Sequence, residues 1–164
     1  MRVKAVVMQF LLMLAVWVLL SGGVTGEILT AGVLVSMAIT FMTSSGVSPL
    51  AQIRLTPRAI LAHLLFFLVF LRELILSNLD VARRVLSPSL PINPGIVKVP
   101  TRLRTPMGRF VLANAITLTP GTFTVEVRND ALFIHWLDID PGDAESASRR
   151  IVSRFEKYLE VAYG

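Results

Sequence analysis

The stretch Asn114-Ala-Ile-Thr-Leu-Thr-Pro-Gly-Thr122 decides how the C-terminal part of this chain folds, because it joins two elements of different kinds. The residues before it are apolar at helical spacing, whereas residues 123–127 alternate between apolar and polar side chains, as a strand does. Pro120 has no backbone N–H to donate, and Gly121 tolerates dihedral angles that other residues avoid. The stretch therefore predicts a sharp turn from helix to strand, in which threonine hydroxyls bind backbone groups that the turn leaves free.

The segments around this turn predict a small α+β domain with the element order β-α-β-β-α. Strand patterns cover residues 96–99, 123–127 and 132–137, and the last is apolar on both faces, as a central strand is. Thr105-Pro106 is typical of a helix start, and Asp140-Pro141 is expected to begin a final helix. Apolar residues at helical spacing form one face of that final helix: Ala144, Ala147, Ile151, Phe155, Leu159 and Ala162.

Three apolar segments precede this domain, at about residues 5–24, 28–43 and 57–79, and each approaches the roughly 20 residues that a membrane helix needs. The chain is 54% hydrophobic and 16% charged, against about 25% charged residues in soluble domains. The first segment also has the size of a secretory signal, but no Ala-x-Ala-like site follows, which favours a membrane helix. We expect a membrane part at 1–86, whose third helix continues as a stalk, a Pro-rich linker at 87–95, and the α+β domain at 96–164.

The distribution of basic residues conflicts with three complete membrane crossings. The basic start, the loop with Arg54 and Arg58, and the arginine-bearing tail each favour the cytoplasmic side. Three crossings place the start and the tail on opposite sides. Either the start faces outward despite its charges, or one of the short segments does not cross fully.

The order of three apolar segments and a polar domain, together with Ile116-Thr-Leu-Thr-Pro-Gly-Thr122, resembles the E subunit of the Mrp-type multisubunit sodium/proton antiporters. The resemblance implies an accessory, non-catalytic subunit that supports assembly and activity of the exchange complex. It implies a multi-pass protein of the cell (inner) membrane with a cytoplasmic C-terminal domain, whose partners are the other antiporter subunits and membrane lipid. The motif positions that it implies for the domain's fold or for an interface are Asn114, Thr117, Thr119, Pro120, Gly121 and Thr122.

Related subunits also occur in membrane-bound hydrogenases and similar respiratory complexes built on antiporter modules. The residues of this chain do not separate that setting from a sodium/proton antiporter.

Ionisable residues in or beside the third apolar segment are the second set of candidates: His63, Arg72 and Glu73. Burying such a group in a membrane is costly, so it suggests a function by default, here in a proton path. The alternative is that these side chains anchor the helix at the interface, with their polar ends in water.

Catalytic patterns are absent from the sequence. There is no cysteine and no P-loop, and the two histidines fall in different parts of the chain. Asp138, Asp140 and Asp143 lack the spacing of a calcium loop. We therefore expect no enzyme activity, no cofactor and no metal.

A cluster of basic residues near the start of the domain leaves a third class of function open. Lys98, Arg102, Arg104 and Arg109 fit either a patch for anionic lipid or an acidic partner, or a solvated surface. A membrane-anchored module that holds anionic lipid or nucleic acid is thus an alternative. The net charge of +5 is better explained by arginines that flank membrane segments, so no nucleic acid is expected.

Overall fold

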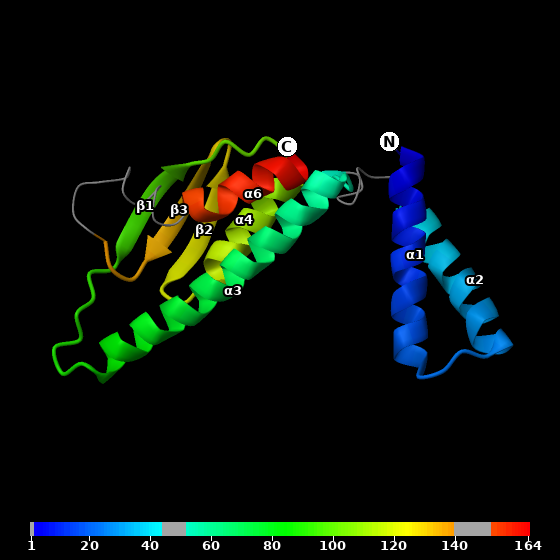
Figure 1. The fold of residues 1–164 in the computed structure, drawn as a ribbon, viewed down its shortest axis with the longest axis horizontal. Coiled ribbons are helices and arrows are strands. Elements are labelled where there is room, and N and C mark those ends of the chain that lie inside the picture. Colours follow the sequence, from blue (N-terminus) through cyan, green and yellow to red (C-terminus); the bar gives the residue numbers. More distant parts are fainter. Residues whose placement is uncertain (1, 44–51, 140–151) are drawn as a thin grey trace. The chain divides into compact units, whose positions relative to one another are not determined.

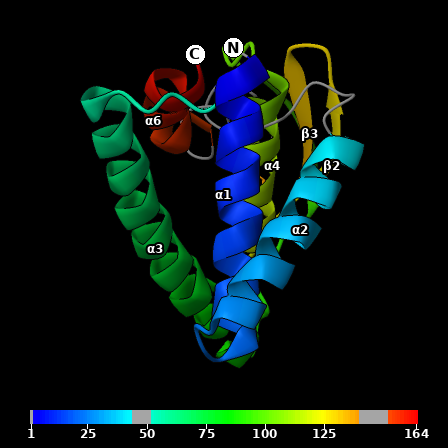
Figure 2. The ribbon, with the colours of Figure 1, turned by 90° about the vertical axis from the view of Figure 1, so that its right-hand side faces the viewer.

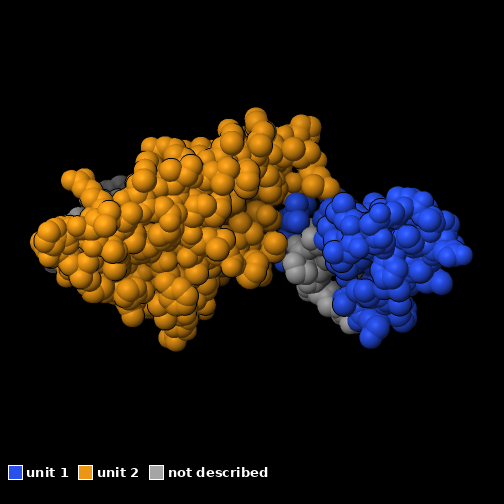
Figure 3. Space-filling view, turned by 90° about the horizontal axis from the view of Figure 1, so that it is seen from below, with its two compact units in different colours: residues 1–53 blue, residues 54–164 orange. Residues whose placement is uncertain are grey.

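The predicted apolar segments form three helices in the computed structural model, which describes residues 2–43, 52–139 and 152–164. They are α1 (Arg2–Ser21), α2 (Gly26–Thr43) and α3 (Pro57–Leu86), and each is long and apolar enough to cross a membrane (Figure 1). The chain divides into two compact units, residues 1–53 and 54–164 (Figure 3).

The first unit is a hairpin of α1 and α2 held together by close approach at small residues. Gly32, Ser36 and Thr40 are buried at four-residue spacing, so they form one stripe along α2. The indole of Trp17 packs over Gly32 and donates a 2.9 Å hydrogen bond to the carbonyl of Ile28. A Cβ atom on Gly32 would lie 2.5 Å from Cδ1 of this ring, so no other residue fits there without a shift.

The packing of the hairpin predicts that two glycines of α2 differ in how well they tolerate replacement by alanine. Gly32→Ala should separate the helices because of the clash with Trp17, at a cost of about 1–3 kcal/mol. Gly26→Ala is the matched control, because a Cβ there meets nothing within 4 Å. The measurement is the yield of a short bis-maleimide cross-link between Gln9→Cys and Thr43→Cys, whose native side chains are hydrogen-bonded. Equal yields in the two glycine variants would contradict the packing.

The second unit contains a three-stranded antiparallel sheet of β1 (Gly95–Pro100), β2 (Thr122–Arg128) and β3 (Ala131–Trp136). The strand order is β1-β3-β2, which confirms β3 as the central strand. The register of β2 against β3 shifts between Thr124 and Glu126, where β2 has a bulge.

Helices α4 (Pro106–Leu118) and α6 (Ser153–Tyr163) complete the predicted β-α-β-β-α order, and they lie between the sheet and α3 (Figures 1 and 2). The predicted threonine caps are present, because Thr56 and Thr105 each accept a 3.2 Å hydrogen bond from the backbone three residues on. The fully buried side chains come from all layers of this domain: Val99, Leu103, Leu112, Ile116, Leu132, Ile134, Val152 and Leu159.

The predicted apolar face of the final helix is partly described. Phe155, Leu159 and Ala162 are buried, as expected. The Asp140-Pro141 start and the expected face residues Ala144, Ala147 and Ile151 lie outside the described residues.

The apolar side chains of β2 point away from the helices. Phe123 and Val125 are 53% and 51% exposed, whereas Thr124 turns toward α4 and donates a 3.1 Å hydrogen bond to the carbonyl of Ala113. Phe123 lies in register with His135 of β3 and, across it, Ile96 of β1. The alternation thus predicted a strand, but its polar side meets the helix, where the Thr124 hydroxyl binds a carbonyl of α4.

Helix α3 packs along α6 and belongs to the same compact unit as the sheet. The division with a linker at 87–95 stays a prediction, and the segment is not free of contacts. Asn93 pairs with the chain after β3, since its backbone N–H donates to the carbonyl of Leu137 at 3.1 Å. The backbone N–H of Ile139 in turn donates to the carbonyl of Asn93 at 2.9 Å.

Candidate functional site

The Thr-Pro-Gly turn is built by hydroxyl groups that bind the last carbonyls of α4. Thr119 donates to Ala115 at 2.7 Å, and Thr122 donates to Ile116 at 2.7 Å. The carbonyls of a helix's last turn lose their regular partners because the helix ends there, and the one of Ile116 also accepts the backbone N–H of Thr119 at 3.2 Å. Gly121 has φ +88, which other residues rarely adopt, and its carbonyl accepts a 2.9 Å hydrogen bond from the backbone of Leu137. The turn is thereby fixed between the end of α4 and the end of β3.

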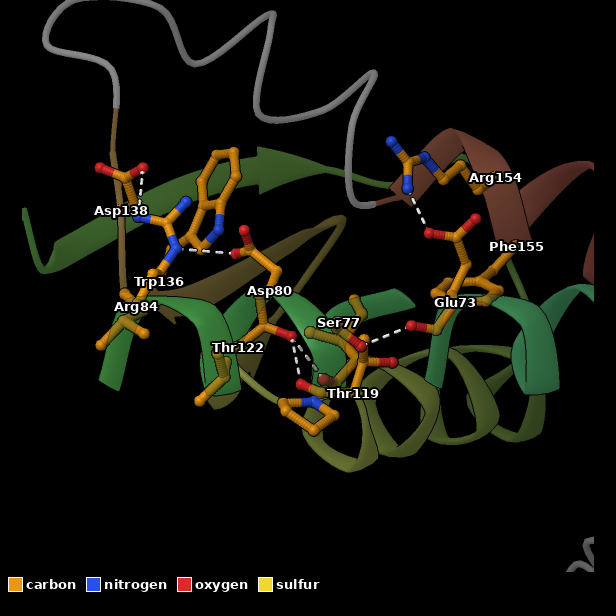
Figure 4. Close-up of a pocket in the computed structure, with 15 residues that line it drawn as sticks. Glu73, Ser77, Asp80, Arg84, Thr119, Thr122, Trp136, Asp138, Arg154 and Phe155 are labelled. Atoms are coloured by element: carbon orange, nitrogen blue, oxygen red, sulfur yellow. Dashed lines mark hydrogen bonds and ion pairs between the residues drawn. The ribbon is translucent and has the colours of Figure 1, made fainter. Parts of the chain in front are cut away.

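The turn forms one wall of a pocket of about 200 Å³ between α3, the end of β3 and the start of α6 (Figure 4). Side chains of α3 form the opposite wall. The pocket is lined by Glu73, Ser77, Asp80, Val81, Arg84, Ile116, Thr119, Pro120, Gly121, Thr122, Trp136, Leu137, Asp138, Arg154 and Phe155.

One end of the pocket holds a buried carboxylate. Glu73 is 7% exposed and forms ion pairs with Arg154 of α6 and, at 2.6 Å, with Arg72. Figure 4 shows the guanidinium of Arg154 reaching Glu73 from across the pocket. Phe155, the next residue on α6, packs edge-on against Phe66 with ring centroids 5.8 Å apart. A charged pair and an aromatic cluster therefore join α3 to α6 at the same level.

The other end of the pocket holds an arginine between two carboxylates. Arg84 binds Asp80 at 2.7 Å on its own helix and Asp138 at 2.8 Å beyond β3. It also donates to the carbonyl of Pro91 at 2.7 Å, in the segment that leads to β1. Arg84 thus connects the end of α3 to the segment before β1 and to the segment after β3.

The charged residues of this pocket connect elements of the fold to one another. Its carboxylates each face a guanidinium, so they have partners in place of a substrate or ion. Within the described ranges, no group of three His, Cys, Asp or Glu residues is placed to hold a metal. Asp138 forms an ion pair with Arg84, whereas Asp140 and Asp143 fall outside the described residues.

The sequence candidates separate into three groups in the structure. Thr119, Pro120, Gly121 and Thr122 line the pocket together with Glu73. Asn114 and Thr117 are exposed on the outer side of α4, where their side chains donate to carbonyls one turn back, at 2.8 and 2.9 Å. The Thr117 hydroxyl also accepts a 3.2 Å hydrogen bond from the backbone N–H of Thr124, so it joins α4 to β2.

His63 lies near the beginning of α3, away from the pocket. Its Nδ1 is 2.7 Å from the carbonyl of Ala59, and its ring meets Tyr163 edge-on at 5.2 Å. Burial raises the pKa of the Tyr163 phenol above its usual value, so the hydroxyl stays neutral beside the imidazole. His135, by contrast, is exposed on the open face of the sheet.

Sequence reasoning missed the pocket partners Asp80, Arg84, Asp138 and Arg154. The i, i+4 spacing of Asp80 and Arg84 is a signal that predicts their helical pairing. No local pattern links Arg154 to Glu73, because the two residues are 81 positions apart.

The basic cluster at the start of the domain is partly used within the fold. Arg102 binds Glu156 at 3.2 Å and Glu160 at 3.0 Å. Arg109 donates to the carbonyl of Leu103 at 2.7 Å and to that of Asn129. Two of the arginines therefore brace α6 and the β2–β3 turn, which leaves less charge for a ligand than the sequence suggested.

The Glu73–Arg154 pair predicts an asymmetric response to mutation. Arg154→Ala should destabilise the chain by about 1–3 kcal/mol, because it removes the α6 partner of a buried carboxylate and leaves it Arg72 alone. Adding Glu73→Gln should recover part of that loss, because the buried charge is then gone. The matched control is Arg128→Ala, whose partner Glu126 is exposed and for which we expect little change.

The measurement is thermal unfolding of the purified full chain in mild detergent. The original chain, the two single variants and the double variant together form a double-mutant cycle. Strictly additive losses for Arg154→Ala and Glu73→Gln would show that the two side chains do not interact.

Comparison with known proteins connects these features to a family. A family model described as Na+/H+ ion antiporter subunit matches residues 10–162. The E subunit of the Na(+)/H(+) antiporter of Alkalihalophilus pseudofirmus is 43% identical over 105 residues, which are 63% of this chain and 66% of that relative. The E1 subunit of the Na(+)/H(+) antiporter of Staphylococcus haemolyticus is 31% identical over 94% of both chains. The match thus spans about two thirds of the first relative's length and almost all of the second's.

A solved structure is similar over almost the whole chain. It is a chain of the membrane-bound sulfane sulfur reductase (MBS), an archaeal respiratory membrane complex. The TM-score is 0.81 with 40% sequence identity, and the alignment covers 96% of this chain and 98% of that chain.

Proposed function

The chain belongs to the family of Na+/H+ antiporter E subunits, and we propose that it works as an accessory, non-catalytic membrane subunit of a multisubunit cation/proton antiporter. The observation that carries this proposal is the family match over residues 10–162, which includes both units of the fold. In this role the chain supports the assembly and activity of the complex and leaves ion movement to other subunits.

The charge distribution supports an accessory role. A cation or proton path needs polar groups inside a helical bundle. Between Ala5 and Thr43, the membrane hairpin has one ionisable residue, Glu27, at the exposed first turn of α2. In the second unit, Glu73 and Asp138 are ion-paired with arginines. These groups stabilise the fold, and none of them forms a continuous polar route.

The setting that we propose is the cell (inner) membrane, crossed by the α1–α2 hairpin, with the α+β domain on the cytoplasmic side. The arginines of the tail support this orientation, because basic segments stay on the cytoplasmic side. The partners are the other subunits of the antiporter complex and membrane lipid.

A second candidate function is the equivalent position in a respiratory membrane complex. The similarity to a chain of the membrane-bound sulfane sulfur reductase favours it, at a TM-score of 0.81 over 96% of this chain. The physical role is the same in both settings, namely a membrane hairpin and a domain that pack against larger subunits. The settings differ in the neighbouring proteins.

Co-isolation separates the two settings. We expect that a tag after Gly164, with extraction of native membranes in mild detergent, recovers large multi-span antiporter subunits in fixed proportion. Hydrogenase-like or reductase subunits in the same fraction would identify the respiratory setting. Recovery of this chain alone, under conditions that keep other complexes intact, would contradict the accessory role.

The outer side of α4 is the part of the motif region best placed for a partner. Asn114 and Thr117 are exposed there beside Phe110 and Leu118, which are each 61% exposed. We infer that a partner covers this side, because an aromatic and an aliphatic side chain stand open beside the polar residues of the motif.

Two neighbouring substitutions distinguish an interface from a structural role. Leu118→Ser should leave the stability of the domain within about 0.5 kcal/mol, because the side chain is exposed, yet it should reduce co-isolation. Thr119→Ala removes the hydrogen bond to Ala115 and should cost about 1 kcal/mol in stability. Pro120→Gly relaxes the turn and should weaken assembly more than local folding.

Thermal unfolding and the yield of co-isolated subunits are measured on the same preparations. If co-isolation falls only in proportion to stability, and Leu118→Ser has no effect, the motif region serves the fold and has no interface role.

A further inference from the structure

We propose that α3 does not cross the membrane, and that it lies along the cytoplasmic membrane surface with its outward apolar face in the boundary between lipid headgroups and acyl chains. The proposal concerns the membrane contact of this chain alone. It therefore holds or fails independently of the ions that the complex exchanges.

The first argument is that the α+β domain contacts α3 from one end to the other. Before the helix begins, the backbone N–H of Arg54 donates to the carbonyl of Ala162 at 3.1 Å. In the middle, Phe155 packs against Phe70 with ring centroids 6.5 Å apart. At the far end, Arg84 binds Asp138 at 2.8 Å.

Figure 1 shows α6 beside the first part of α3, and α4 and β2 beside the turns that follow. A helix of 30 residues is about 45 Å long, which exceeds the roughly 30 Å of a bilayer's hydrocarbon core. If α3 crossed, the domain packed along it would have to cross as well.

The second argument is the charge on the element that covers the most apolar half of α3. The contacts from Arg54 to Glu73 are made by α6, which carries Arg154, Lys157 and Glu160 besides the buried Glu156. A crossing α3 would draw these charges into the hydrocarbon, where ionised groups are costly. Arg72 and Glu73 would also lie near the middle of the helix.

The third argument is the composition of the outward face. The residues of α3 that are buried, line the pocket or meet α6 recur at 59, 62, 66, 70, 73, 77, 81 and 84, a spacing that follows one side of a helix. The opposite side exposes large apolar side chains: Ile60, Leu61, Leu64, Leu65, Phe67, Leu68, Ile75, Leu76, Leu79, Val85 and Leu86.

Exposed arginines are distributed along this helix, at Arg58 near its start, Arg72 in its middle and Arg83 near its end. An apolar stripe accompanied by cations suits an anionic lipid surface, into which amphipathic helices insert by about 5–10 Å. The charges favour lipid over another protein as the occupant of this face.

The fourth argument is that this placement removes the conflict among the basic segments. Two crossings by α1 and α2 return the chain to the side on which it started. Arg54 and Arg58 then share that side with the basic start at Arg2 and Lys4. Because α3 does not cross, the arginines of the domain stay there too, and all three segments satisfy the preference for the cytoplasm.

The test of sidedness uses single cysteines in the full chain, which has no cysteine of its own. Leu55→Cys and Leu86→Cys flank the two ends of α3, and both native side chains are exposed. A membrane-impermeant maleimide should label both from the cytoplasmic side, together with Val3→Cys, in inside-out but not right-side-out vesicles. Gly23→Cys, between α1 and α2, is the control and should label from the opposite side. Labelling of Leu55→Cys and Leu86→Cys from opposite sides would overturn the proposal.

The test of the lipid contact measures depth along the outward face. Nitroxide labels at Leu64→Cys, Leu68→Cys, Ile75→Cys and Leu79→Cys in reconstituted full-length protein should collide with dissolved oxygen and report similar, shallow depths. Labels at Leu34→Cys and Met42→Cys on α2 should differ in depth and serve as the crossing control. A steady gradient from Leu64→Cys to Leu79→Cys would mean that α3 crosses.

The same depth measurement, made on the purified native complex in lipid, decides the occupant. Oxygen collisions retained in the complex support lipid. Labels that are immobile and protected from both oxygen and a water-soluble relaxant would mean that another protein of the complex covers the face, which would overturn the lipid assignment.

Discussion

The packing of α6 against α3 is the constraint on which the second unit depends. Phe155 lies against the aromatic rings of α3 while Arg154, one residue before it, neutralises the buried carboxylate of Glu73. The apolar contact and the ion pair need each other, because a buried carboxylate is tolerated only with a partner, and the aromatic contact holds that partner in reach. Without α6, the inner side of α3 would expose its apolar stripe, and Glu73 would keep only Arg72 of its own helix as a partner.

The Thr-Pro-Gly turn has its place in the same construction. Its hydroxyls satisfy the end of α4, and its glycine carbonyl binds the chain after β3. The turn therefore sets where Asp138 emerges, and Asp138 holds Arg84 at the end of α3. The turn thus helps to position a long-range ion pair through the hydrogen bond between Gly121 and Leu137.

Local features of this fold could be predicted from the sequence, and long-range ones could not. The three apolar helices, the threonine caps at Thr56 and Thr105 and the central place of β3 follow from spacing and composition. The side of β2 that meets α4 does not, because hydrogen bonds of Thr124 outweigh its apolar alternation. The two long-range ion pairs of the pocket, Arg84–Asp138 and Glu73–Arg154, join residues 54 and 81 positions apart, and no periodicity within a segment encodes such a meeting.

The α3–α6 contact also orders events during synthesis. Every other described element of the second unit is made before α6, so α3 leaves the ribosome long before its packing partner exists. During that interval its inner aromatic residues and Glu73 have no protein cover, and the nascent unit is in the state most open to misfolding or proteolysis. The second unit can therefore reach its complete fold only after residues 153–163 have been synthesised.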